Sequence, residues 1–255
     1  MASCFIPFTS RNLESSFFVF RQTVVLVDEL IDALKRFSLS TVSLGCVNSA
    51  IFTSIHGSMI IWCGAWIKRS KENKESLDGT LQSMLKNEVL SIAVLIDYCF
   101  FDAYGGSSRD GSPTAEFYRG DTISMYSANF SSKDDIQQAS YAALAIFKSN
   151  FLKMKGSSTS GVCLKSQKQH RIIGLSVWKS LEDCYSYIFD VDYREVVLPY
   201  LDDAIIRSME FKYDIFRVAF VSGDEEKEAT FNSQPHHFPA SLIGNGFEVV
   251  NHKLD

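Results

Sequence analysis

The stretch RIIGLSVWKSLEDCYSYI, residues 171–188, decides the fold class. Arg171–Trp178 is a short apolar run, which is typical of a buried strand. Ser180 follows as a helix-capping residue, and Glu182 and Asp183 place negative charge in the first turn of the helix after it. A buried strand that passes directly into a capped helix predicts a layered protein with both elements.

The segments around this stretch complete a strand–helix–strand–strand–helix–strand series. Asp134–Lys155 is expected to be a long helix, which opens after Ser131–Ser132 and ends at Gly156. A second helical piece is expected over Glu195–Met209, started by Pro199. The other expected strands are Asp121–Phe130, Gly161–Lys165 and Phe211–Ser222.

The first half of the chain carries the same series. The expected strands are Phe17–Arg21, Thr41–Val47, Met59–Lys68 and Val89–Phe101. The expected helices are Val24–Phe37 and Lys71–Lys86, in which apolar residues recur at helical spacing.

The third strands of the two halves also align residue by residue. Ile60, Ile61 and Trp66 match Ile172, Ile173 and Trp178, and Cys46 and Cys163 fall in the preceding strands. Duplication of a βαββαβ unit is the simplest account of the repeated order. Chance similarity among apolar strands is the alternative.

Residues 171–188 resemble the antibiotic-biosynthesis-monooxygenase and stress-responsive α+β barrel families. In these families an apolar strand ends in a Trp-x-Ser step before an acidic-capped helix, and here the step is Trp178-Lys179-Ser180. The first half departs from the pattern, because Ile67-Lys68 follows Trp66. Its assignment therefore rests on the repeat.

The resemblance implies an α+β fold of ferredoxin-like sheets, each with helices on one face. Two tandem units would join sheet to sheet as an intramolecular α+β barrel, so that the chain is a monomer by pseudo-dimerisation; a homodimer is the alternative. The 20 phenylalanines would fill the space between the sheets. Those expected there are Phe17, Phe18, Phe20, Phe100, Phe101, Phe130, Phe211, Phe216 and Phe220.

The predicted boundaries follow from this repeat. We expect a flexible segment at 1–16, ferredoxin-like units at 17–103 and 121–222, a Gly- and Ser-rich linker at 104–120 and a polar tail at 223–255.

Composition narrows the possible partners and the location. The net charge of −5 offers no electrostatic footprint for nucleic acid, and no apolar run reaches membrane-helix length. The six cysteines form no CxxC pair and are expected to be core residues in a reducing compartment. No metal site is expected, since adjacent His236–His237 rarely face one ion. We expect a cytoplasmic protein; a plastid location is the alternative, because residues 1–16 weakly resemble a transit peptide.

The family resemblance places a pocket between the sheet and the helices of the second unit. It implies ligand-binding roles for Asn129, Phe147 and Trp178, and His170, Tyr126 and Tyr141 are the candidate proton-transfer residues. Simpler alternatives are that Trp178 is core, that His170 is a solvated turn residue and that the tyrosines are structural. Asp97 interrupts an apolar strand, so we expect it to be paired, functional or turned to solvent.

No cofactor is expected. Haem-degrading members have an Asn on the first strand, a Trp and a ligand His about ten residues beyond that Trp. Here that region reads Ile188-Phe189-Asp190. No phosphate loop, dinucleotide, nucleophile-elbow or zinc-protease motif occurs. The leading hypothesis is a barrel that binds an apolar small molecule; the alternatives are a cofactor-free monooxygenase or cyclase, and a structural or stress-related barrel without a pocket.

Overall fold

The computed structural model describes residues 2–9, 12–23, 27–153, 158–190, 196 and 199–223. The helix end expected at Gly156, the pair His236–His237 and the tail beyond residue 223 lie outside these residues. None of the described helices is both long enough and apolar enough to cross a membrane.

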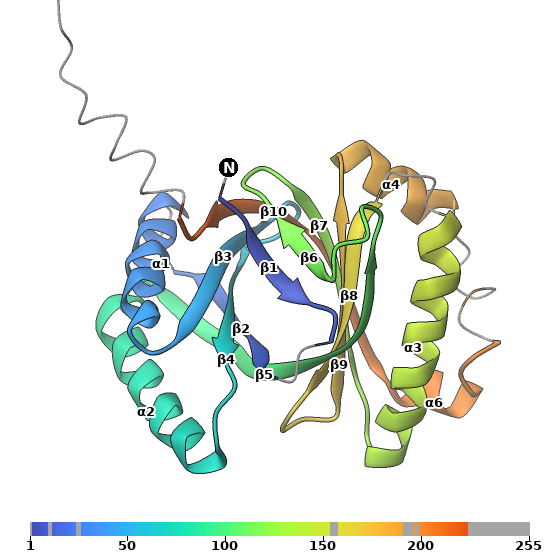
Figure 1. The fold of residues 1–255 in the computed structure, drawn as a ribbon, viewed down its shortest axis with the longest axis horizontal. Helices are drawn as coiled ribbons and strands as arrows, with labels where there is room; N and C mark the ends of the chain where they lie inside the picture. Colours follow the sequence, from blue (N-terminus) through green and yellow to red (C-terminus); the bar gives the residue numbers. More distant parts are fainter. Residues whose placement is uncertain are drawn as a thin grey trace, which may run out of the picture. The chain divides into compact units, whose positions relative to one another are not determined.

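In the described chain, eight strands form a closed barrel in the order β10-β3-β4-β2-β5-β8-β9-β7 (Figure 1). Every neighbouring pair in this order is antiparallel. The strands are β2 (Leu13–Gln22), β3 (Cys46–Ser54), β4 (Met59–Ile67), β5 (Ala93–Ser108), β7 (Thr122–Asn129), β8 (Ser158–Ser166), β9 (Arg171–Trp178) and β10 (Glu210–Val221). The predicted α+β barrel is therefore confirmed.

The strand order is the same in the two halves of the chain. Strands of the first half lie in the order β3-β4-β2-β5, and those of the second half in the order β8-β9-β7-β10. Two seams join the halves, one between β5 and β8 and the other between β10 and β3.

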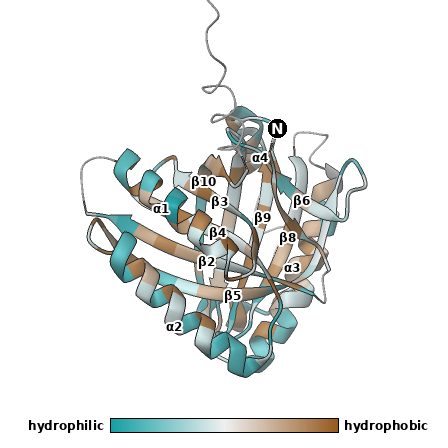
Figure 2. Ribbon diagram, turned by 60° about the vertical axis from the view of Figure 1, so that its left-hand side comes forward, coloured by the Kyte–Doolittle hydropathy of each residue, from teal (hydrophilic) through white to brown (hydrophobic). Residues whose placement is uncertain are grey.

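The helices cover the outside of the barrel, with α1 and α2 on one side and α3, α4 and α6 on the other (Figure 1). They are α1 (Val27–Val42), α2 (Lys71–Glu88), α3 (Lys133–Lys153), α4 (Leu181–Asp190) and α6 (Asp203–Ser208). The expected cap of α4 is present, because Ser180 Oγ accepts a hydrogen bond from the Asp183 amide over 3.0 Å. Hydropathy colouring shows polar residues concentrated on the outer faces of α1 and α2 (Figure 2).

A two-stranded ribbon fills part of the barrel interior. Strand β1 (Cys4–Pro7) pairs with β6 (Thr114–Phe117), and both lie across the ring of barrel strands (Figure 1). The side chains of Ile6 and Phe117 are fully buried in the same cluster as the inward-facing residues of the barrel. The prediction of a flexible segment at 1–16 is wrong over β1 and the start of β2, because these residues bury apolar side chains.

The predicted linker at 104–120 is also wrong in part, since β5 runs to Ser108 and β6 lies within this range. Its glycines serve close packing within a strand rather than flexibility. A Cβ on Gly106 would lie 2.1 Å from the Phe8 ring and 2.7 Å from the Gly161 carbonyl oxygen. Only a residue without a side chain fits there.

The structure corrects the predictions at Thr41–Val47 and Glu195–Met209. The strand expected at Thr41–Val47 begins only at Cys46, because Thr41 and Val42 end α1. There the hydroxyl of Thr41 donates to the Ser38 carbonyl over 2.7 Å. This bond satisfies a polar side chain inside the helix, so the β-branched residue is accommodated there. The helix expected over Glu195–Met209 is described only as the short α6.

The phenylalanines do not all lie between the sheets as expected. Alternation along each strand sends neighbours to opposite faces. Phe17, Phe101 and Phe216 point into the barrel, whereas Phe18, Phe20, Phe100 and Phe220 pack in the cluster beneath α1 and α2. Phe130 packs in the cluster that contains α3 and α6 residues, and Phe211 is exposed. The rings therefore fill several cores, not one.

Candidate functional site

A cavity of about 120 Å³ lies between the second-half sheet and its helices. Strands β7, β9 and β10 form one wall, and α3 and α4 supply the opposite wall. The lining is rich in aromatic side chains, namely Tyr126, Phe130, Phe147, Trp178, Tyr187, Phe211 and Tyr213. No described lining residue is charged, so the cavity suits an uncharged molecule.

Trp178 is fixed in the cavity wall by a buried hydrogen bond. Its side chain is 1% exposed, and its indole N–H donates to Ser124 Oγ over 2.8 Å. The indole also packs on Tyr187 of α4, with ring centroids 5.2 Å apart. This orientation is set by the fold and does not depend on a ligand.

Gly174 makes room for the Tyr126 ring in this part of the wall. A Cβ at this position would lie 2.0 Å from the ring of Tyr126, the residue directly opposite on β7. The tyrosine ring therefore lies across the bare backbone of β9. Any side chain on residue 174 would push Tyr126 into the cavity.

Asn150 supplies a polar group at the α3 wall. Its side chain is 6% exposed, and it forms no side-chain hydrogen bond with another described residue. A side-chain amide in a cavity wall can donate a hydrogen bond to a ligand or accept one from it. Asn150 is thus positioned to select a ligand with a hydroxyl or carbonyl group.

The structure brings together three of the six residues proposed from the sequence. Tyr126, Phe147 and Trp178 line the cavity. Tyr141 is 68% exposed on α3, where its hydroxyl accepts a hydrogen bond from Gln137. His170 lies on the exposed turn before β9, and its carbonyl accepts from the Phe130 amide over 2.8 Å.

Asn129 lies at the end of the barrel rather than in this cavity. Its side-chain oxygen accepts from Arg171 Nε over 2.6 Å, and its amide donates to Glu210 over 2.9 Å. Arg171 also forms an ion pair with Asp97. Of the alternatives expected for Asp97, the structure shows the paired carboxylate.

The corresponding region of the first half contains large side chains instead. Trp62 lies opposite Phe18 on the β2–β4 ladder, at the place where Gly174 lies opposite Tyr126 on the β7–β9 ladder. The Trp62 ring packs on Phe18 and on Phe37 of α1, with centroids 5.5 and 5.0 Å apart. Its indole N–H donates to Ser38 Oγ over 2.7 Å.

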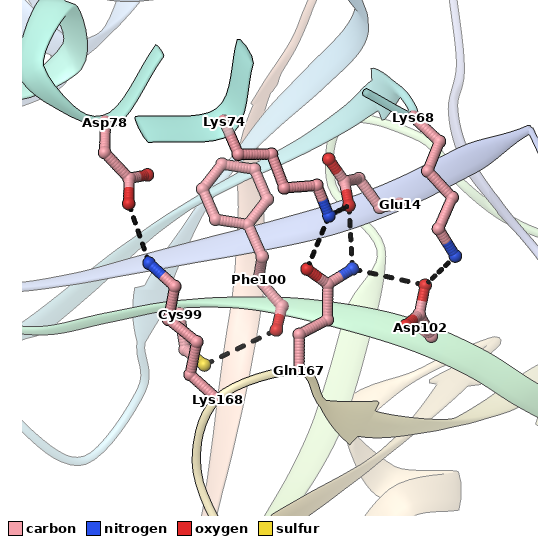
Figure 3. Close-up of polar contacts among 9 residues, drawn as sticks. All are labelled: Glu14, Lys68, Lys74, Asp78, Cys99, Phe100, Asp102, Gln167 and Lys168. Atoms are coloured by element: carbon pink, nitrogen blue, oxygen red, sulfur yellow. Dashed lines mark hydrogen bonds and ion pairs between the residues drawn. The ribbon is translucent and has the colours of Figure 1, made fainter. Parts of the chain in front are cut away.

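A polar cluster that the sequence did not predict ties the two halves together (Figure 3). The carboxylate of Glu14 is fully buried and accepts from Lys74 Nζ over 2.5 Å and from Gln167 Nε2 over 2.7 Å. Gln167 belongs to the β8–β9 turn, whereas Lys74 belongs to α2. A second contact pairs Lys168 with Asp78 over 2.8 Å, and this hydrogen bond raises the pKa of Lys168. The cluster is a clamp between the halves.

The cysteines are free and buried, as expected for core residues. Burial raises the pKa of Cys46 and of Cys163 to about 12, and that of Cys184 to about 11. No group of three or more His, Cys, Asp or Glu residues in the described part of the chain could hold a metal ion. The described residues that line the cavity include no histidine.

Comparison with known proteins supports the fold. A family model described as a domain of unknown function, DUF7392, matches residues 99–216. A search of curated proteins finds no match.

Solved structures of similar fold are numerous. An anthrone oxidase-like protein is 14% identical, with a TM-score of 0.64 over 86% of this chain and 95% of that one. A candidate monooxygenase from Fusobacterium nucleatum is 8% identical, with a TM-score of 0.58 over 82% and 94%. A heme-binding protein from Thermus thermophilus is 11% identical, with a TM-score of 0.51 over 90% and 97%. These likenesses confirm the α+β barrel fold, and they carry no activity to this chain.

Proposed function

We propose that the chain is a tandem pair of ferredoxin-like units, at 17–103 and 121–222, whose second unit binds an apolar small molecule. The binding site is the cavity lined by Tyr126, Phe147 and Trp178. The single observation that carries this proposal is the glycine at position 174, where the first half has Trp62.

The tandem arrangement is supported by a repeated tryptophan–serine contact. Trp66 pairs across its ladder with Glu14 and donates to Ser16, two residues further along, over 2.8 Å. Trp178 pairs with Thr122 and donates to Ser124, also two residues further along, over 2.8 Å. Matching register and matching hydrogen bonds are what a duplicated unit would retain.

The seams between the halves support the same relationship. Phe101 pairs with Ser166 across one seam, and Phe216 pairs with Ser54 across the other. A register shift follows at Ala103/Gly105 in the first case and at Val218/Phe220 in the second. Each irregularity therefore begins two residues after the equivalent phenylalanine. Because both seams close within one chain, we propose a monomer that needs no second copy to complete the barrel.

The absence of a large side chain at Gly174 supports a binding site in the second half and not in the first. Trp62, with Phe18 and Phe37, occupies the space between sheet and helix in the first half. Gly174 leaves the equivalent space to the Tyr126 ring, which lines the cavity. A tryptophan in the first half and a glycine in the second are what we expect of a duplicated protein in which one pocket is kept and the other is filled.

The lining favours binding over catalysis. His170 and Tyr141, the candidate proton-transfer residues, do not line the cavity. Tyr126 lines it, so a monooxygenase or cyclase that relies on this hydroxyl is the alternative. The ligand expected from the lining is an uncharged aromatic or alicyclic molecule with one oxygen that accepts or donates a hydrogen bond at Asn150.

Titration with the uncharged fluorescent probe N-phenyl-1-naphthylamine tests the binding site. Ala143 lines the cavity from α3, whereas Lys148 is exposed on the same helix. Ala143→Phe should reduce probe binding by about 10-fold or more by filling the cavity, and Lys148→Phe should leave it unchanged. Equal probe binding by both variants would refute the proposal.

Native mass spectrometry of protein purified from its own source identifies a retained ligand. Incubation of that ligand with the protein in air separates the two functions. A ligand recovered intact supports binding, whereas a product that Tyr126→Phe no longer forms supports the enzyme.

A further inference from the structure

A second cleft, separate from the cavity under the helices, opens at one end of the barrel. Its volume is about 590 Å³. The β1–β6 ribbon fills the barrel toward the other end, since Phe8, next to β1, contacts Gly106 near the end of β5. The cleft is instead lined by the opposite part of β5, from Ile96 to Phe101.

The floor of the cleft is apolar and comes from both halves. Register-equivalent residues of the two halves line it, namely Phe17 and Met125, Ile61 and Ile173, and Phe101 and Phe216. All of them belong to, or pack against, the core of the barrel interior. A hydrocarbon or aromatic body would be desolvated on this floor.

One wall of the cleft is charged, and here the two halves of the barrel differ. Arg171 begins β9 at the position where Met59 begins β4. Its guanidinium is 18% exposed and donates through Nε to Asn129 and through Nη1 to Asp97. Lys212 lies on the same rim, paired with Glu210 over 2.8 Å.

Arg171 keeps donor capacity at this wall. Arginine has five N–H groups, and the two contacts of Arg171 leave its Nη2 group available. The two carboxylates at this wall are held by the protein: Asp97 accepts from Arg171, and Asp214 accepts from Ser54 and from the Ile215 amide. A ligand carboxylate would complement the Nη2 group of Arg171 through a charge-assisted hydrogen bond.

We propose that the barrel-end cleft binds an amphipathic carboxylate, with its apolar body on the Phe101–Phe216 floor and its carboxylate on Arg171. Lys212 contributes a second positive charge at the rim. This site does not depend on the cavity beneath the helices, because the two share only Phe211 and Tyr213 of β10.

Calorimetric titration with decanoate tests the site, with decyltrimethylammonium as a probe of matched chain and opposite charge. Arg171→Gln should weaken decanoate binding by about 10-fold or more, because a charge-assisted contact is lost. Arg36→Gln, which changes an exposed arginine on α1, should leave it unchanged. Binding of decyltrimethylammonium should be weaker than that of decanoate and should not fall in the Arg171→Gln variant.

Two further variants show which of the two cavities holds the bound decanoate. Val19 lines the cleft from β2, so Val19→Phe should abolish decanoate binding even if Arg171→Gln fails to fold. Ala143→Phe fills only the other cavity and should leave decanoate binding intact. The proposal is overturned if decanoate shows no saturable binding, if Arg171→Gln and Arg36→Gln bind it equally, if Val19→Phe retains it, or if Ala143→Phe abolishes it.

Discussion

Trp178 and Ser124 form a buried hydrogen bond of 2.8 Å across neighbouring strands of the second half. Removal of the hydroxyl by Ser124→Ala leaves the indole N–H without a partner in a site closed to water. We expect a loss of about 1–3 kcal/mol in the free energy of unfolding. Urea denaturation followed by far-UV circular dichroism measures it. Ser16→Ala removes the matching partner of Trp66 and should cost a similar amount; a loss below about 0.5 kcal/mol in both variants would contradict this account.

Gly174→Ala introduces a methyl group that would clash with the Tyr126 ring. The ring must move into the cavity, so we expect a loss of about 1–3 kcal/mol in stability and weaker binding of the apolar probe. Gly79→Ala is the matched control. Nothing lies within 4 Å of a Cβ at this exposed position of α2, and alanine should stabilise the helix by about 1 kcal/mol. Equal melting temperatures for the two variants would refute the close contact at Gly174.

The buried pair Glu14 and Lys74 should behave as one unit. Glu14→Gln leaves the Lys74 ammonium without its charged partner, and we expect a loss of about 1–3 kcal/mol. Lys74→Met leaves the carboxylate, whose Oε1 already lacks a partner among the described residues, and should cost at least as much. The double variant Glu14→Gln/Lys74→Met should lose less than the sum of the two. Strict additivity in this double-mutant cycle would show that the contact carries no coupling.

Buried thiols predict a loss of stability at alkaline pH. The raised pKa values of Cys46 and Cys163, about 12, mean that the folded protein keeps these thiols protonated where the unfolded chain ionises them, above its ordinary value of 9.0. The contribution of these thiols to the free energy of unfolding is therefore complete below pH 9, and it is lost as the pH rises toward 12. At pH 10, each thiol should lower the free energy of unfolding by about 1.4 kcal/mol relative to its value at pH 8. Urea midpoints at the two pH values measure this effect, and Cys163→Ala should make the pH dependence shallower.

The same burial predicts slow thiol chemistry. Ellman's reagent at pH 8 should leave the native thiols unreacted for minutes and should modify all six in denaturant. Rapid modification of any described thiol in the native protein would contradict its burial.

Local signals explain why β9 and α4 were predicted closely. Arg171–Trp178 is apolar apart from Arg171 and Ser176, and the Ser180 cap marks the start of α4, so pattern and capping agree. Where tertiary packing decides, the prediction failed. Gly105-Gly106 looks like a linker in sequence, but these residues lie in a strand because Phe8 and Leu144 approach them.

The cavity was predicted in part, because family resemblance points to the strand that carries Trp178. Gly174 was missed, although a signal was present: Ile60-Ile61-Trp62 aligns with Ile172-Ile173-Gly174, and a tryptophan replaced by glycine marks lost volume. The Asp97–Arg171 pair and the Glu14 clamp join segments from different halves. No local pattern in one sequence encodes such contacts.

The seam between β10 and β3 has a consequence for how the chain folds during synthesis. Ser54 and Asp214, which bond across it, are 160 residues apart in sequence. Strand β3 therefore leaves the ribosome long before its partner, with an unpaired edge that other chains could join. Closure of this seam should be a late step in folding, and a holdase chaperone that shields β3 until β10 emerges would raise the yield of folded protein.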